Sequence, residues 1–137
     1  MQTVERMLSK NPNHLSVDLS ALAKCVNACA ACGLVCTECA DACDGERPEL
    51  AALRRCVRLN LDCAAICGAT ANVLSRQLLP DGALLRAQLE ACAVACAVCG
   101  DECENHAEAH EHCRVCAEAC GRCEELCRTV LRNLSAG

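Results

Sequence analysis

The chain of 137 residues has no aromatic side chain, since Phe, Tyr and Trp are all absent. Without these rings the protein cannot stack on nucleic-acid bases or on a flat cofactor, and it cannot build a large aromatic core. Basic residues are also in the minority, with 13 Lys and Arg against 18 Asp and Glu, and the net charge is −5. This balance gives no reason to expect nucleic acid or an anionic membrane as a partner.

Two kinds of targeting segment are not found. The N-terminal stretch MQTVERMLSKNPNHL lacks a basic start followed by an apolar run of about 7–15 residues, so it does not resemble a signal peptide. The chain also has no stretch of about 18 uncharged apolar residues, which a transmembrane helix needs. We therefore expect a cytoplasmic protein without a membrane span, whose thiols stay reduced.

Cysteine is the residue that the chain has in excess, with 18 copies. In a reducing compartment, a cysteine pattern this dense binds metal more often than it forms disulfides. The stretch CVNACAACGLVCTECADAC, residues 25–43, repeats cysteine every three or four positions. That spacing places every thiol of the stretch on one side of an α-helix.

Helix-breaking residues divide the chain into four long helical segments. Ser16 or Asp18 can cap the first, Gly45 ends it, and Pro80-Asp81-Gly82 separates the second from the third. After a short helical segment over residues 1–10, the predicted helices cover about 16–44, 48–79, 83–104 and 113–133. Short links join antiparallel neighbours, so we predict an all-α, up-down-up-down four-helix bundle. We expect one domain over residues 1–137, with residues 1–14 as a short N-terminal extension.

Each predicted helix has one seam of inward a and d positions, and every cysteine of the chain lies on such a seam. The candidate metal ligands are Cys25, Cys29, Cys32, Cys36, Cys39 and Cys43 on the first helix, Cys56, Cys63 and Cys67 on the second, Cys92, Cys96, Cys99 and Cys103 on the third, and Cys113, Cys116, Cys120, Cys123 and Cys127 on the fourth.

Several readings of these thiols can be compared. Cysteines used only as core residues would leave the bundle axis underfilled, which costs stability. Thiols three or four residues apart on one helix fit disulfide geometry poorly. Zinc prefers four tetrahedral ligands, and an iron–sulfur cluster needs four convergent thiolates, usually from loops.

The i, i+4 thiol pairs suit a two-coordinate soft ion, and thiolates select Cu(I). One Cu(I) per bridging thiolate also leaves no net charge in a dry core. We therefore expect about 18 Cu(I) per monomer, or slightly more, from one ion per bridging thiolate.

The inward CxxxC and CxxC pairs on all four helices resemble those of the bacterial copper storage proteins, and the missing export signal makes the chain similar to their cytosolic branch. The resemblance covers about residues 16–134. It implies storage and detoxification of Cu(I) by a protein that is not an enzyme and that commonly assembles as a tetramer. It assigns a ligand role to each of the 18 cysteines. A copper chaperone or an efflux system is then a candidate partner.

The two ends of the predicted bundle differ in composition. One end is plugged by leucines, namely Leu15, Leu22, Leu74, Leu78, Leu85, Leu89, Leu131 and Leu134. The other end carries thiols almost to the rim, together with histidines. Because imidazole can bind Cu(I), we predict that copper enters there and that His106 and His110 are additional ligands. Whether Asn60, Asp62 or His112 also bind copper stays open, while His14 lies at the plugged end.

Two other functions remain as alternatives. One is a zinc or mixed-metal buffer that resembles metallothionein, which a metal titration would distinguish. The other is a thiol redox protein that uses the CxxC pairs. Such proteins place one activated thiol at a helix N-terminus, and none of the 18 cysteines stands out in that way.

Overall fold

The computed structural model describes residues 2–136, with side chains from residue 3 to residue 134, and over this range it contains helices and no strand. Its elements are α1 (Gln2–Lys10), α2 (Leu19–Gly45), the 3-10 turn η1 (Arg47–Glu49), α3 (Leu50–Leu74), α4 (Gly82–Glu104) and α5 (Glu111–Ala136).

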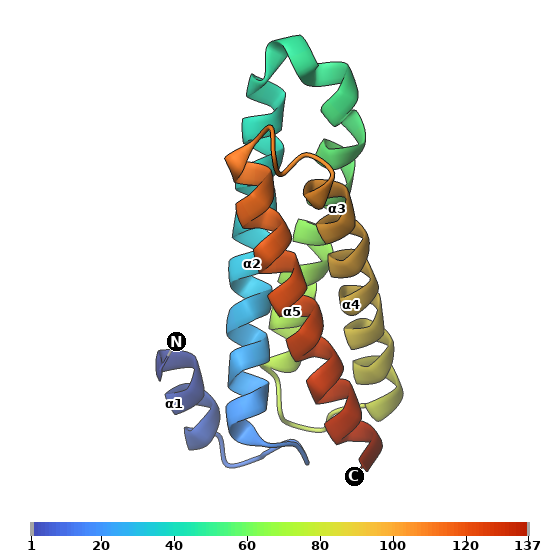
Figure 1. Cartoon of the computed structure of the whole chain (residues 1–137). Coiled ribbons are helices and arrows are strands. Elements are labelled where there is room, and N and C mark those ends of the chain that lie inside the picture. Colours follow the sequence, from blue (N-terminus) through green and yellow to red (C-terminus); the bar gives the residue numbers. More distant parts are fainter. Residues whose placement is uncertain (1, 137) are drawn as a thin grey trace.

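The four long helices stand side by side around one axis (Figure 1). α2 packs against α3 and α5, and α4 packs against the same two helices, so each helix has two neighbours. Consecutive long helices run in opposite directions, and both chain ends lie in the lower half of the view. The predicted up-down-up-down bundle is confirmed, and short α1 lies against the outside of α2.

Side-chain caps fix where two of the helices begin. The carboxylate of Asp18 accepts a hydrogen bond from the backbone N–H of Ala21 at 2.9 Å, so Asp18 rather than Ser16 caps α2. Asp81 does the same for α4 by accepting from Leu84 N–H at 2.9 Å.

The second long helix ends earlier than the sequence suggested. α3 stops at Leu74 instead of continuing to about residue 79. The Ser75 hydroxyl donates to the Ala71 carbonyl at 2.7 Å, and Leu79 has a positive φ of 53°. Beyond the end of the helix, the 3-4 spacing no longer determines which side chains point toward the bundle axis. Leu78 is consequently 64 % exposed, so its assignment to the leucine plug was wrong.

Gln77 takes the buried place that Leu78 leaves, with 2 % of its surface exposed. Its amide nitrogen donates to the Leu8 carbonyl at 3.1 Å, and its amide oxygen accepts from the Leu15 N–H at 3.4 Å. These two bonds hold the segment from α1 to α2 against the closed end of the bundle, where Leu8 and Leu15 join the core.

The rest of the leucine plug is as expected. Side chains from all four long helices fill the axis below the cysteines, and the residues buried there are Leu22, Leu74, Leu85, Leu89 and Val130. Leu131 and Leu134 pack partly buried against this cluster. Apolar burial therefore closes one end of the bundle without any metal.

α2 and α4 are long and apolar enough to span a membrane by length and composition alone. The core helix of a soluble protein passes the same test, so this is weak evidence. In the bundle both helices turn their cysteine seams toward the axis.

Candidate metal centre

All 18 cysteine side chains lie inside the bundle as free thiols, and none is more than 2 % exposed. The 3-4 spacing on each helix directs them to the common axis, where seams from facing helices meet. Their sulfur atoms approach one another at 3.6 to 4.0 Å, within helices and between them. The result is a tube lined with sulfur, as the sequence predicted.

Sulfur contacts run along the tube from the leucine plug. Cys127 lies 3.8 Å from both Cys25 and Cys29, sulfur to sulfur, and so joins α5 to α2. On the opposite side, Cys67 and Cys96 join α3 to α4 at 3.6 Å. Each such pair presents two soft ligands from different helices to the same space.

Several sets of four ligand atoms lie within 4.8 Å of one another. Three of the all-cysteine sets are Cys29/Cys92/Cys123/Cys127, Cys32/Cys63/Cys67/Cys96 and Cys36/Cys99/Cys116/Cys120. Some sets share members, since Cys32 also belongs with Cys36, Cys63 and Cys120. Shared thiols are what bridging between neighbouring soft ions requires, so the donor set fits Cu(I).

The end of the tube that carries the histidines has a mixed set made of Cys39, Cys43, Cys113 and His112. Nδ1 of His112 lies 3.5 Å from the Cys39 sulfur and 3.6 Å from the Cys113 sulfur. The sequence left open whether His112 is a ligand, because this residue does not continue a cysteine seam. In the structure it is the histidine that faces the thiols.

His110 lies above this set and is held by carboxylates. Its Nδ1 is 3.1 Å from Glu46 and its Nε2 is 3.0 Å from Glu49, while Glu46 also reaches Nε2 of His112 at 3.2 Å. The two rings stack with centroids 5.3 Å apart. His110 is therefore buried at the histidine end of the bundle, and its ring nitrogens face carboxylate oxygens rather than sulfur.

Sequence reasoning missed Glu46 and Glu49. Both belong to the connection between α2 and α3, and His110 belongs to the connection between α4 and α5. An antiparallel bundle brings these two connections to the same end (Figure 1). The proximity of these glutamates to His110 could therefore have been predicted from the bundle topology, but not from residue spacing along a helix.

The other sequence candidates are placed as follows. Nε2 of His106 lies 2.9 Å from Glu102, which also pairs with Arg55 at 3.3 Å. Asp62 pairs with Arg58 at 2.9 Å on the outer surface. His14 is exposed, near the closed end.

Asn60 lies inside the tube and is fully buried. Its amide contacts the sulfur atoms of four cysteines, which are Cys56, Cys99, Cys103 and Cys116.

Burial and neighbouring thiols favour the neutral form of Cys43 and Cys113 at the histidine end, because they raise the pKa of both side chains. Burial, together with the neighbouring thiol of Cys56, raises the pKa of Cys113 to about 11. Burial also raises the pKa of Cys43 above its ordinary value, with Cys56 and Cys113 acting in the same direction. Thiolates crowded in a dry tube would repel one another, so a bound cation has to take the place of each proton.

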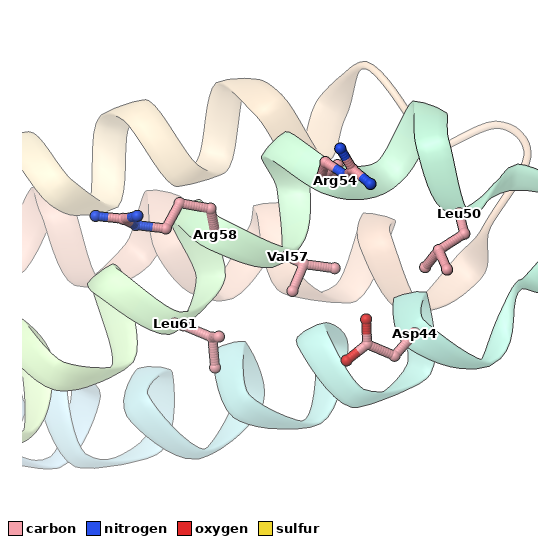
Figure 2. A pocket seen from close by; sticks show the side chains of 6 residues that line it. All are labelled: Asp44, Leu50, Arg54, Val57, Arg58 and Leu61. Carbon is pink, nitrogen blue, oxygen red and sulfur yellow. The ribbon is translucent and has the colours of Figure 1, made fainter.

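The outside of the bundle also has a groove, of about 370 Å³, between the end of α2 and the first half of α3. Figure 2 shows Leu50, Val57 and Leu61 on α3, with Asp44 facing them from α2. Arg54 and Arg58 complete the lining, which contains no cysteine. The thiol tube is thus separate from this groove.

Buried thiols on four facing helices, spaced for bridging, define a helical-bundle protein that binds many soft metal ions. The comparisons with known proteins specify this class further. The chain belongs to the copper storage protein family, because the model of that family, Csp, matches residues 18–132.

Solved structures agree with this assignment. The copper storage protein Ccsp from Streptomyces lividans, loaded with 10 copper equivalents, is 50 % identical to this chain with a TM-score of 0.92. That match covers 95 % of this chain and 98 % of Ccsp. A variant of Ccsp with two histidines replaced by alanine is 50 % identical, with a TM-score of 0.85, covering 87 % of this chain and 99 % of the variant.

A structure described as copper loading to a cytosolic copper storage protein from Streptomyces lividans, with five coppers, is 53 % identical. Its TM-score is 0.81, and the match covers 82 % of this chain and 93 % of that one. A comparison with curated proteins gave no match.

Proposed function

We propose that this protein stores Cu(I) in the cytosol and thereby detoxifies it, with the thiolates of all 18 cysteines as ligands. The observation that carries the proposal is the continuous sulfur-lined tube, in which every cysteine is buried and thiols lie 3.6 to 4.0 Å from their neighbours. Membership of the copper storage family and similarity to copper-loaded and cytosolic relatives support the metal and the compartment.

The proposed content is about 18 Cu(I) per monomer, from one ion per bridging thiolate, or slightly more if histidines contribute. Each ion replaces thiol protons, which leave to solvent, so that loading adds little net charge to the interior. The protein is proposed to act as a store rather than an enzyme, because all 18 thiols are buried alike and exposure sets none of them apart as a reactive nucleophile.

Copper is proposed to enter at the histidine end, past His106 and His110. The thiols near the opposite end are covered by leucines, whereas His112 stands at the mouth next to Cys39 and Cys113. An ion captured by imidazole at the rim can pass from His112 to these thiols without crossing apolar packing.

The assembly is proposed to be a homotetramer, as the resemblance implies, and a copper chaperone or efflux system is its proposed exchange partner. Light scattering on a sizing column measures the assembly directly. Mixing the loaded protein with a candidate copper chaperone, and then separating the two, measures exchange.

Anaerobic titration of the reduced protein with Cu(I), against a chromogenic chelator, tests the proposed function. We expect all added copper to leave the chelator until about 18 ions per monomer are bound, as bridging thiolates allow. A plateau at about four or fewer would contradict storage and favour a small zinc-type or redox site. In the same assay Zn²⁺ should fill fewer sites and be displaced by Cu(I), which separates the store from a zinc buffer.

A further inference from the structure

Two imidazole rings and one carboxylate converge at the histidine end of the bundle. Oε2 of Glu46 lies 3.1 Å from Nδ1 of His110 and 3.2 Å from Nε2 of His112. The two rings also stack on each other, with centroids 5.3 Å apart. Storage of Cu(I) by thiolates gives no role to a carboxylate that is shared by two imidazoles.

The spacing of these three atoms fits the ligand shell of a zinc ion. Zinc binds imidazole nitrogen and carboxylate oxygen at about 2.0–2.2 Å, and a tetrahedral ion with such bonds holds its ligand atoms about 3.3 Å apart. Two His and one Glu form a known zinc ligand set, in which water takes the fourth position. Water can reach the site, because the side chains of His112 and Glu46 are 25 % and 35 % exposed.

The other nitrogen of each ring has a partner of its own. Nε2 of His110 lies 3.0 Å from the carboxylate of Glu49, and Nδ1 of His112 lies 3.5 Å from the sulfur of Cys39. A metal-bound imidazole usually donates its second N–H to a carboxylate or another acceptor, which fixes the orientation of the ring. Glu49 stands where such an outer partner of His110 is needed.

The donor types separate this group from the thiol sets. Its ligand atoms are nitrogen and oxygen, which suit Zn²⁺, whereas the soft thiolates of the tube select Cu(I). The two carboxylates, Glu46 and Glu49, together offset the double charge of the ion, so that binding leaves little net charge at this end. The ring nitrogens bind the ion without protons, and any displaced protons leave to solvent.

We propose that Glu46, His110 and His112 bind one Zn²⁺ ion, and that Glu49 accepts a hydrogen bond from the outer nitrogen of His110. The ion occupies the imidazoles past which copper is proposed to move, so zinc slows the passage of copper through the histidine end. This inference rests on the proposed storage of Cu(I), because thiolates filled with copper leave zinc to the nitrogen and oxygen ligands.

The test uses the protein loaded anaerobically with Cu(I), about one ion per cysteine, so that the thiolates are occupied. Zn²⁺ is added in competition with a chromogenic zinc chelator, and X-ray absorption at the zinc edge is measured with one equivalent bound. We expect a single ion per monomer, with nitrogen and oxygen ligands at about 2.0–2.2 Å and no sulfur at about 2.3 Å.

Three variants locate the ion. Glu46→Gln removes the charged ligand and should weaken zinc binding by more than about 100-fold, beyond the loss of about 10–100-fold that is typical of an outer partner and is expected for Glu49→Gln. Glu111→Gln is the matched control, because Glu111 is an exposed carboxylate at the same end that pairs with Arg114 at 3.2 Å. It should bind zinc as the wild type does, and circular dichroism checks that each variant is folded.

The rate of copper removal by a Cu(I)-selective chelator gives a second readout. One equivalent of Zn²⁺ should slow the initial rate severalfold in the wild type and in Glu111→Gln. It should leave the rate of Glu46→Gln unchanged, because this variant does not hold the ion.

Four results would overturn the inference. The copper-loaded protein could bind no zinc, which would leave the three side chains as ion pairs only, or it could bind zinc through sulfur. Glu46→Gln and Glu111→Gln could bind zinc equally, or zinc could leave the rate of copper removal unchanged in the wild type. A wild-type protein that takes up no copper would instead refute the proposed function.

Discussion

Truncating Leu89 tests whether apolar packing, rather than metal, holds the bundle together. Leu89 lies in the plug with 0 % of its surface exposed. Replacing a fully buried leucine by alanine removes its transfer free energy and leaves a cavity, at a cost of about 2–5 kcal/mol. Unfolding entropy of about 2.1 cal/mol/K per residue gives roughly 0.3 kcal/mol/K for a chain of this length. Leu89→Ala should therefore lower the melting temperature of the apo protein by about 7–17 °C.

Leu78→Ala is the matched control, because Leu78 belongs to the same end of the molecule but is 64 % exposed. An exposed substitution of this kind should change stability by less than about 0.5 kcal/mol. The assay is thermal unfolding of the reduced, metal-free proteins by circular dichroism, followed by Cu(I) titration. Both variants should keep the wild-type copper capacity, since neither removes a thiol.

Equal melting temperatures for the two variants would show that the plug does not carry the stability assigned to it. A metal-free protein that is a random coil, and becomes helical only with copper, would refute the reasoning altogether. The fold would then depend on metal, as it does in a zinc finger.

Other predictions follow from the two ends of the tube and from the thiol chemistry. Replacing both His106 and His110 by Ala should slow copper uptake in stopped-flow measurements and leave capacity within about two ions of wild type, because imidazole here transfers copper to thiols that remain. Replacing Cys25 or Cys92 by Ser, beside the plug, should lower capacity slightly at a normal initial rate; a histidine variant that loads at wild-type speed would refute the assigned mouth. Because the pKa of Cys113 is raised to about 11, its contribution to apo stability is present below the ordinary thiol pKa of 9.0 and is lost as the pH rises through about 11. The melting temperature of the reduced apo protein should accordingly fall by at least about 5 °C between pH 8 and pH 11, and a flat profile would contradict neutral buried thiols.

The helices and the thiol tube could be predicted because both depend on local periodicity. A cysteine at every third or fourth position fixes which side of a helix faces inward, and Asp18 and Asp81 mark helix starts by their own chemistry. The burial of all 18 thiols then follows once four such helices pack together.

Contacts that depend on how connections fold could not be predicted in the same way. Because α3 ends at Leu74, the helical periodicity no longer determines which of the following side chains face inward. Leu78 is therefore exposed and Gln77 is buried. The pairing of His110 with Glu46 and Glu49 joins residues more than 60 positions apart. Spacing along one helix carries no information about such a pair, and only the bundle topology does.

The most direct test of the thiol tube as a copper store is anomalous diffraction at the copper edge from crystals of the fully loaded protein. We expect a row of copper peaks along the bundle axis, from the thiols beside the leucine plug to Cys113 and His112 at the mouth. Each peak should lie between sulfur atoms of neighbouring seams, with about one ion per cysteine, as bridging thiolates require. Copper found mainly at surface carboxylates and histidines, with an empty axis, would contradict the account.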